Sequence, residues 1–125
     1  MITEVKRDLV ALLKEAGGDI PITYDFLGEN TGKGLVVTNL NMNIESNLSN
    51  DLIFDTMTAD IMIISPYVNE VDQLADALLR DAPYSVGWIR SLQFTGASFT
   101  GDPTTGLHVC TLNISCEVNA NGPGD

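Results

Sequence analysis

Two hydrophobic periods divide the chain, one typical of helices and the other typical of strands. Between residues 2 and 16 the apolar positions recur three to four residues apart, which predicts an amphipathic helix that stops at Gly17-Gly18. A second helix is expected after Ser65-Pro66, with Ser65 as its cap and Pro66 in its first turn, and Pro83 prevents its continuation. The stripe of the first helix is narrow, so we expect that helix to lie on a sheet, and the second helix is expected to pack on the sheet as well. The stripes contain Ile2, Val5, Leu9, Leu12, Leu13 and Ala16, and then Val71, Leu74, Ala75, Leu78 and Leu79.

Strand patterns fill most of the remaining chain. A short strand is expected within residues 20–27, behind Pro21, and a long one over residues 52–65. A closing hairpin is predicted from strands over 86–99 and 107–118, joined by a turn over Thr100–Gly106. Another long strand over 36–45 shows strict alternation. Its predicted apolar face holds Val36, Thr38, Leu40, Met42 and Ile44, and its polar face holds Asn39, Asn41, Asn43 and Glu45.

The order of these elements predicts an α+β fold. A helix, a short strand, two long strands, a second helix and two more long strands give a largely antiparallel sheet of about five strands with two helices packed against it. A length of 125 residues is typical of a single domain, which we place at residues 1–118. Residues 119–125 are polar, contain Gly and Pro, and are predicted to be a flexible tail.

Charge limits the classes of partner. The chain has 17 acidic and 6 basic residues, which gives a formal net charge of −11. Tight binding of DNA or RNA is not expected, because nucleic-acid binders carry a basic stripe and the few cations here are scattered. The first residues are charged where a signal peptide needs an apolar run, and no run approaches the length of a membrane span. We therefore expect synthesis in the cytosol and no membrane partner.

No group of residues predicts catalysis, a metal or a cofactor. The loop Gly28–Gly34 has three glycines around Lys33, but it lacks the residue order of a phosphate-binding loop, and a mobile loop is the preferred interpretation. Cys110 and Cys116 share a strand face about 20 Å apart, too far for a disulfide, so both are expected to be buried and reduced. His108 lies on the same face, and we interpret it as a packed or boundary residue because a structural zinc needs about four ligands. The acids Asp51, Asp55 and Asp60 lack the order of a calcium loop and are interpreted as a solvated face.

The chain offers better candidates for contacts between proteins. Trp88 and Arg90 fall on one face of a predicted strand, a composition that interfaces enrich, although ordinary core for Trp88 with Arg90 at its edge is the favoured interpretation. The segments Glu45–Asp51 and Thr100–Gly106 could be arms that become ordered on assembly, and surface loops without function have the same composition. The candidate interface residues are Glu45, Asn47, Asn50, Asp51, Trp88, Arg90, Thr100, Gly101, Asp102, Pro103 and Thr104.

The order of elements over nearly the whole chain resembles the tail terminator proteins of long-tailed bacteriophages. Three stretches carry the resemblance: the helix Glu4–Ala16, the passage Phe54–Pro66 continuing into Leu74–Leu78, and the ending Gly106–Glu117. The Gly28–Gly34 loop and the asparagine-rich strand depart from it. Neighbouring neck, tail-completion and tail tube proteins share related folds, so the same pattern is compatible with them.

The resemblance implies a structural role without catalysis. It implies a ring, of six subunits, at the head-proximal end of the tail tube, which ends tube polymerisation and joins the tail to a head connector or neck protein. It implies a place in the virion, where double-stranded DNA passes through without specific binding, as acidic residues facing a channel would allow. Open sheet edges could close such a ring through a heterologous interface. The alternative from another class is a regulatory domain that binds a small molecule near Lys33.

Overall fold

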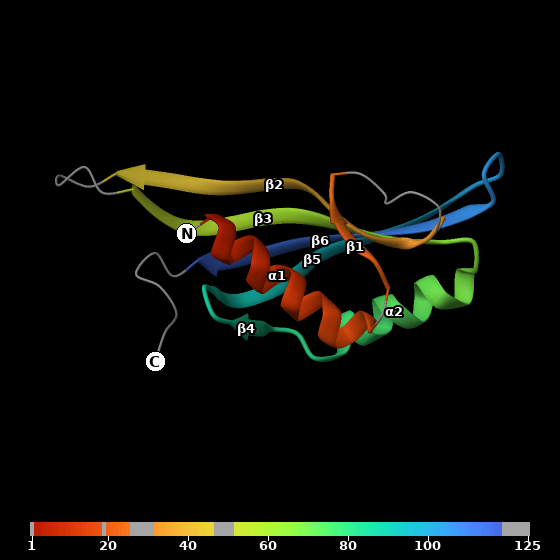
Figure 1. The fold of residues 1–125 in the computed structure, drawn as a ribbon, viewed down its shortest axis with the longest axis horizontal. Helices are drawn as coiled ribbons and strands as arrows, with labels where there is room; N and C mark the ends of the chain where they lie inside the picture. Colours follow the sequence, from red (N-terminus) through yellow and green to blue (C-terminus); the bar gives the residue numbers. More distant parts are fainter. Residues whose placement is uncertain (1, 19, 26–31, 47–51, 119–125) are drawn as a thin grey trace.

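The structure is a computed structural model that describes residues 2–18, 20–25, 32–46 and 52–118 of the chain. In the described residues each of two helices is followed by three strands (Figure 1). In chain order they are α1 (Ile2–Gly17), β1 (Ile22–Tyr24), β2 (Gly34–Ser46), β3 (Leu52–Ser65), α2 (Val68–Arg80), β4 (Tyr84–Val86), β5 (Ile89–Asp102) and β6 (Leu107–Val118). The predicted bounds of β3 and β6 agree with the structure.

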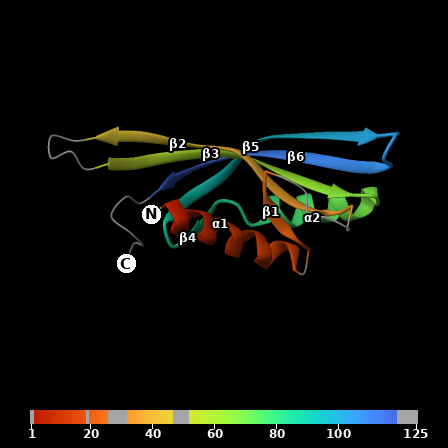
Figure 2. The same cartoon turned by 45° about the horizontal axis from the view of Figure 1, so that its top comes forward.

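One sheet with the strand order β1-β2-β3-β6-β5-β4 joins all six strands. Only β1 and β2 run parallel, and the other neighbours are antiparallel, so the predicted α+β class with a largely antiparallel sheet is confirmed. The predicted count of about five strands missed β4, because Gly87, with a φ of +55°, turns the chain between β4 and β5 where one strand was expected. Both helices lie on the same side of the sheet, which leaves its other face bare of helices (Figure 2).

The hydrophobic core fills the space between the helices and the sheet. Along β6 the buried residues alternate as predicted, with Cys110 and Leu112 fully buried and His108 half-buried at the end of the series. Two members of the predicted helix stripes are exposed. Ile2 is 50% exposed at the first position of α1, and Leu79 is 40% exposed because its neighbour Leu78 occupies the side of α2 that faces the core. The core cluster comprises Val5, Leu9, Leu12, Leu13, Leu35, Val37, Met57, Ala59, Ile61, Ile63, Val71, Ala75, Leu78, Ile89, Leu92, Cys110, Leu112, Ile114, Cys116 and Val118.

A bulge in β2 overturns the predicted face of that strand. Thr38 pairs with Asp60, but the next pair is Asn41 with Thr58, so β2 contains one extra residue at this point. Asn39 has a φ of +53°, in the left-handed region that asparagine tolerates better than most residues. The extra residue reverses the alternation. Odd-numbered Leu35 and Val37 belong to the core cluster before the bulge, whereas even-numbered Leu40 and Met42 pack against it afterwards, so the prediction of one face from Val36 to Ile44 was wrong.

Candidate assembly surface

The β5–β6 hairpin continues to its tip as paired strands. The sequence placed Thr100–Asp102 in a loop, but β5 runs to Asp102, which pairs with Leu107, and only the four residues between them form the turn. That turn is built by its own residues: the Gly106 amide donates to the Asp102 carbonyl at 2.8 Å, and the Thr104 amide donates to the Asp102 carboxylate at 2.9 Å. The Thr104 amide contact lowers the pKa of Asp102. The candidate residues Thr100, Gly101, Asp102, Pro103 and Thr104 are all exposed at this end.

An exposed apolar patch lies beside the hairpin. Phe99 of β5 is 61% exposed, and Val68 and Tyr67 at the start of α2 are 47% and 63% exposed. A hollow of about 330 Å³ is lined by Val68, Phe99 and half-buried His108, with residues next to them in the fold. The interpretation of His108 as a boundary residue agrees with this position. Sequence analysis missed Phe99 and Val68, because an alternating strand gives no sign that its apolar face extends past the helices.

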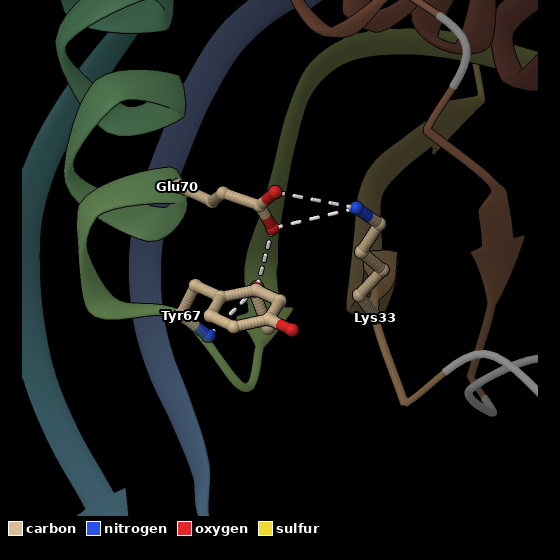
Figure 3. A network of polar contacts seen from close by, with 4 residues as sticks. Lys33, Tyr67 and Glu70 are labelled. Atoms are coloured by element: carbon tan, nitrogen blue, oxygen red, sulfur yellow. Dashed lines mark hydrogen bonds and ion pairs between the residues drawn. The ribbon is translucent and has the colours of Figure 1, made fainter.

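A polar network fixes the start of α2 to the start of β2 (Figure 3). The Ser65 hydroxyl donates to Glu70 Oε2 at 2.7 Å and accepts from the Tyr67 amide at 3.0 Å, while Lys33 Nζ lies 3.4 Å from both Glu70 carboxylate oxygens. The hydrogen bond from Ser65, and secondarily that from Lys33, lower the pKa of Glu70. The helix begins at Val68 with Tyr67 as its N-cap, so the prediction of Ser65 as the cap was wrong. Ser65 instead holds the first turn through Glu70.

Lys33 also tests the phosphate-loop interpretation. Residues 26–31, which include most of the Gly28–Gly34 loop, lie outside the described residues, and the Lys33 ammonium points to the Glu70 carboxylate (Figure 3). A hollow of about 430 Å³ adjoins this pair, between the end of α1, the residues just before β1, and α2. It is lined by Ala16, Gly17, Ile20, Pro21, Lys33, Glu70, Gln73, Leu74 and Ala77.

The structure separates Trp88 from Arg90. Trp88 lies in the turn between β4 and β5, where it packs partly against the core and its backbone amide donates to Asp8 Oδ2 at 2.8 Å. Arg90 is exposed within β5. The two therefore do not share a strand face as the sequence predicted, because the Gly87 turn interrupts the alternation. Asp8, which links α1 to this turn, carried no signal in the sequence.

The other candidate segment falls largely outside the described residues. Asn47, Asn50 and Asp51 are not described, and for Glu45 only the backbone, within β2, is described. The structure describes the acidic residues Asp51, Asp55 and Asp60 only in part. Asp51 and the Asp55 side chain lie outside the description, and Asp60 accepts hydrogen bonds from Asn39 at 2.9 Å and Asn113 at 2.6 Å. These bonds connect β2, β3 and β6 on the bare face of the sheet.

Chemistry-bearing groups do not converge in the described part of the chain. Among those residues no cluster of three His, Cys, Asp or Glu side chains could hold a metal ion. Cys110 and Cys116 are free and buried, as expected, and burial raises the pKa of Cys116 to about 11 and also raises that of Cys110. Within the same residues, neither helix has the length and apolar character to cross a membrane.

Comparison with known proteins gives a result only at the level of structure. No family model matches the chain, and no curated protein matches it. Nine chains of solved structures match, among them a chain of a structure titled "Virion of native gene transfer agent (GTA) particle". That chain is 15% identical, superposes with a TM-score of 0.53, and the match covers 91% of this chain and 90% of that one. At this identity the match shows a shared fold over nearly the full length of both chains.

Proposed function

We propose that this chain is a structural subunit of a phage-like virion. Copies of it form a ring, of six subunits, at the head-proximal end of a tail tube, where the ring ends tube polymerisation and meets a head connector or neck protein. The observation that carries the proposal is the fold match, over nine tenths of both chains, to a chain of a gene transfer agent virion. The resemblance to tail terminator proteins supports the finer assignment.

The chemistry of the described residues supports a structural role over a catalytic one. The polar groups of these residues bind one another within the fold. Glu70 accepts a hydrogen bond from Ser65 and pairs with Lys33, and Asp8 accepts one from the Trp88 amide. Asp60 accepts hydrogen bonds from two asparagine side chains. Both thiols are buried. Within the described residues, the end of the β5–β6 hairpin exposes apolar Phe99 beside Val68, a surface that a neighbouring subunit could cover.

The acidic charge of the chain supports a ring through which DNA could pass without being bound. A formal net charge of −11 gives each subunit a field that repels phosphate, and a ring of copies multiplies it. A nucleic-acid binder needs clustered cations to release counterions, whereas Lys33 is paired with Glu70. Double-stranded DNA would therefore pass through such a ring without specific binding.

The experiment that tests the proposal combines negative-stain electron microscopy with native mass spectrometry. The purified chain is examined over a wide concentration range, with and without tail tubes assembled from the tube protein of the same virus. Closed rings of one size, free or at tube ends, are the expected result. A chain that neither associates with itself nor caps tubes at any concentration would refute the proposal.

A tail tube subunit is the nearest alternative within the same class. A tube subunit adds copies on both faces of each ring, so it would give long cylinders in the same micrographs, whereas a terminator stops after one ring. Other neck or tail-completion subunits would form rings that bind the connector but leave tube length unchanged. Measuring tube length with and without the protein therefore separates the three assignments.

The hollow beside Lys33 favours one function of a different class. Its volume of about 430 Å³ falls in the range of small-molecule sites. An anionic ligand would have to compete with Glu70 for Lys33, since the two side chains lie 3.4 Å apart. A thermal-shift screen with nucleotides and phosphorylated metabolites tests this alternative, because a ligand that binds the native state raises its melting temperature. No shift with any compound is the result expected for a structural subunit.

A further inference from the structure

Each of the two outer long strands is paired along only half of its outer edge. On the outer side of β2, β1 pairs with Leu35–Val37, and among the described residues no strand continues this pairing along residues 40–46. On the outer side of β5, β4 pairs with residues between Ile89 and Leu92, and within the described chain residues 96–102 have no strand neighbour there. An unpaired strand edge presents a row of backbone N–H and C=O groups that can pair with another chain.

The two open edges lie on opposite sides of the same sheet and at opposite ends of it. β2 and β5 are the outer long strands, with β3 and β6 between them. The open half of β2 is its C-terminal half, at the left in Figure 1, whereas the open half of β5 reaches the hairpin tip at the right. The two edges therefore cannot meet within one molecule. They can meet only between two copies, with the open half of β2 in one copy beside the open half of β5 in the next.

The side chains along both open edges have the same two-faced arrangement. On the helix side, Leu40 and Met42 of β2 pack against the core, and Phe99 of β5 lies opposite buried Cys110 and so shares its face. The opposite face carries exposed Asn41 and Asn43 on β2, and on β5 it carries exposed Ser98 and Thr100. A sheet joined at these edges would keep apolar residues on the helix side and Asn, Ser and Thr on the bare face.

We infer that copies of this chain join head to tail, with residues 96–102 of β5 in one copy pairing antiparallel with residues 40–46 of β2 in the next. The antiparallel direction follows from the order of strands, because β2 and β5 of one copy already run in opposite directions. Matching the faces requires an even-numbered residue of β5 opposite Asn43, and Ser98 and Thr100 are the two that leave the longest overlap between the open stretches. Registers that place Asn43 opposite Ala97 or Phe99 would put an amide into the apolar side.

Head-to-tail pairing of different edges is heterologous, and it closes a ring when the rotation between copies closes. The open halves lie at opposite ends of the sheet, so each copy is displaced along the strands relative to its neighbour. Displacement of this kind is what a sheet needs to close into a barrel, whose strands tilt by about 35–45° from the axis. The inference rests on the proposed function for the closed ring, and the edge pairing itself is measurable separately.

Disulfide trapping tests the pairing and its register. One protein carries Asn43→Cys, a second carries Ser98→Cys and a third carries Thr100→Cys, all at exposed positions, and they are oxidised alone and in pairs. Directly opposite strand residues have Cα atoms about 4.5–5.5 Å apart, within disulfide reach. We expect a covalent dimer when Asn43→Cys is mixed with one of the two β5 variants, and no dimer from any variant alone. The native thiols are buried, so oxidised wild type is the blank.

A pair of cysteines on opposite faces and two matched lysine substitutions serve as controls. Asn43→Cys mixed with Ala97→Cys joins opposite faces and should give at least tenfold less dimer than the better matched pair. Separately, Ala97→Lys puts a charge on the helix side of the open edge and should abolish self-association. Ala11→Lys makes the same change at an exposed site of α1 and should leave association unchanged. The melting temperatures of both Lys variants are measured as well. Values close to that of the wild type show that a loss of association is not caused by a folding defect.

The possible results separate the inference from the function. Rings that persist in Ala97→Lys without any trapped dimer would overturn the edge pairing while leaving the proposed virion ring intact. Trapped dimers that extend to closed rings, but never affect tail tubes, would support the pairing and refute the terminator role. Dimers formed by Ser98→Cys alone would mean that the β5 edges of two copies pair with each other symmetrically, which overturns the head-to-tail arrangement. A wild-type chain that stays monomeric with and without tubes would overturn both.

Discussion

β2 and β5 are both long outer strands, and each has a covered half and an open half. In the covered half of β2, Leu35, Val36 and Val37 are all buried, and in that of β5 Ile89 and Leu92 are fully buried. In the open half of β5 every residue from Ala97 to Asp102 is exposed. An irregularity in strand pairing separates the halves in both strands, at Asn39 in β2, which has a positive φ, and between Phe94 and Gly96 in β5. The covered halves belong to the core of the monomer, whereas the outer edges of the open halves have no strand neighbour in the described chain.

The difference separates folding from assembly along the same strands. Burial of apolar side chains stabilises the monomer in proportion to the area removed from water, so the covered halves contribute most of it. Ala97 to Asp102 of β5 are exposed, Leu40 and Met42 of β2 are only partly buried against the core, and no other strand of the described chain pairs with these outer edges. Substitutions in the covered half should therefore act on monomer stability, and substitutions in the open half should act on association.

The largest contrast is expected between Leu112→Ala and Ser98→Ala. Leu112 is fully buried opposite Ile61, so its truncation leaves a cavity and should lower the free energy of unfolding by about 2–5 kcal/mol. Ser98 is exposed, and its change should stay within about 0.5 kcal/mol. Urea unfolding followed by the fluorescence of Trp88, the single tryptophan, measures both. Equal effects of the two substitutions would contradict the division between the buried core of the sheet and the exposed open half of β5.

Two glycines with positive φ make a more closely matched comparison. Gly106 at the open hairpin tip has a φ of +72° and no atom within 4 Å of an added Cβ, so Gly106→Ala should cost only the backbone strain, about 1–2 kcal/mol. Gly87 at the covered end has a φ of +55°, and an added Cβ would lie 2.8 Å from Asp8 Cγ.

Gly87→Ala should therefore cost clearly more than Gly106→Ala, because it adds a clash to the strain and displaces the carboxylate that accepts from the Trp88 amide. The same urea titration gives both values, and Asp8→Ala provides the cost of losing that acceptor alone. If Gly106→Ala were the more destabilising of the two, the tip would be carrying tertiary structure that the described contacts do not show.

The same division explains which features the sequence could predict. β3 and β6 lie between neighbours on both sides, so their hydrophobic patterns reflect burial directly, and their bounds were predicted correctly. In β2 the alternation of apolar and polar residues in the sequence continues unchanged across the bulge. The extra residue is signalled by nothing in the sequence except an asparagine at position 39. The Gly87 turn was missed for a similar reason, as a single glycine between apolar residues resembles a strand.

The candidate site divides in the same way. The turn-forming residues of the hairpin tip predicted that the tip would be exposed. The structure agrees, because Thr100–Thr104 are exposed. The apolar patch at Phe99 depends on where α2 begins over the sheet, which is a tertiary property. Contacts between distant residues had no local signal at all: Lys33 and Glu70 are 37 positions apart, and Asp8 and Trp88 are 80 apart. Whether the proposed interface residues meet a partner remains a prediction for the assembly experiments.

The smallest effect is expected at Glu70, where the covered part of the sheet meets the start of α2. Its pKa is lowered in the folded chain, first by the Ser65 hydroxyl and then by Lys33. A carboxylate with a lowered folded pKa stabilises the native state above its unfolded pKa, and that contribution is lost as the pH falls through the folded value. Glu70→Gln should therefore lower the melting temperature near neutral pH, and the difference from wild type should vanish in acid.

The order of the two causes supplies a sharper test than the melting temperature. Because the Ser65 hydroxyl donates at 2.7 Å and Lys33 lies at 3.4 Å, Ser65→Ala should raise the pKa of Glu70 more than Lys33→Met does. Titration of the Glu70 carboxyl carbon by NMR measures each shift, and Asp76→Asn, which removes a charge elsewhere on the exposed side of α2, is the control. A larger shift in Lys33→Met would mean that the ion pair, not the hydroxyl, holds the start of α2 to the sheet.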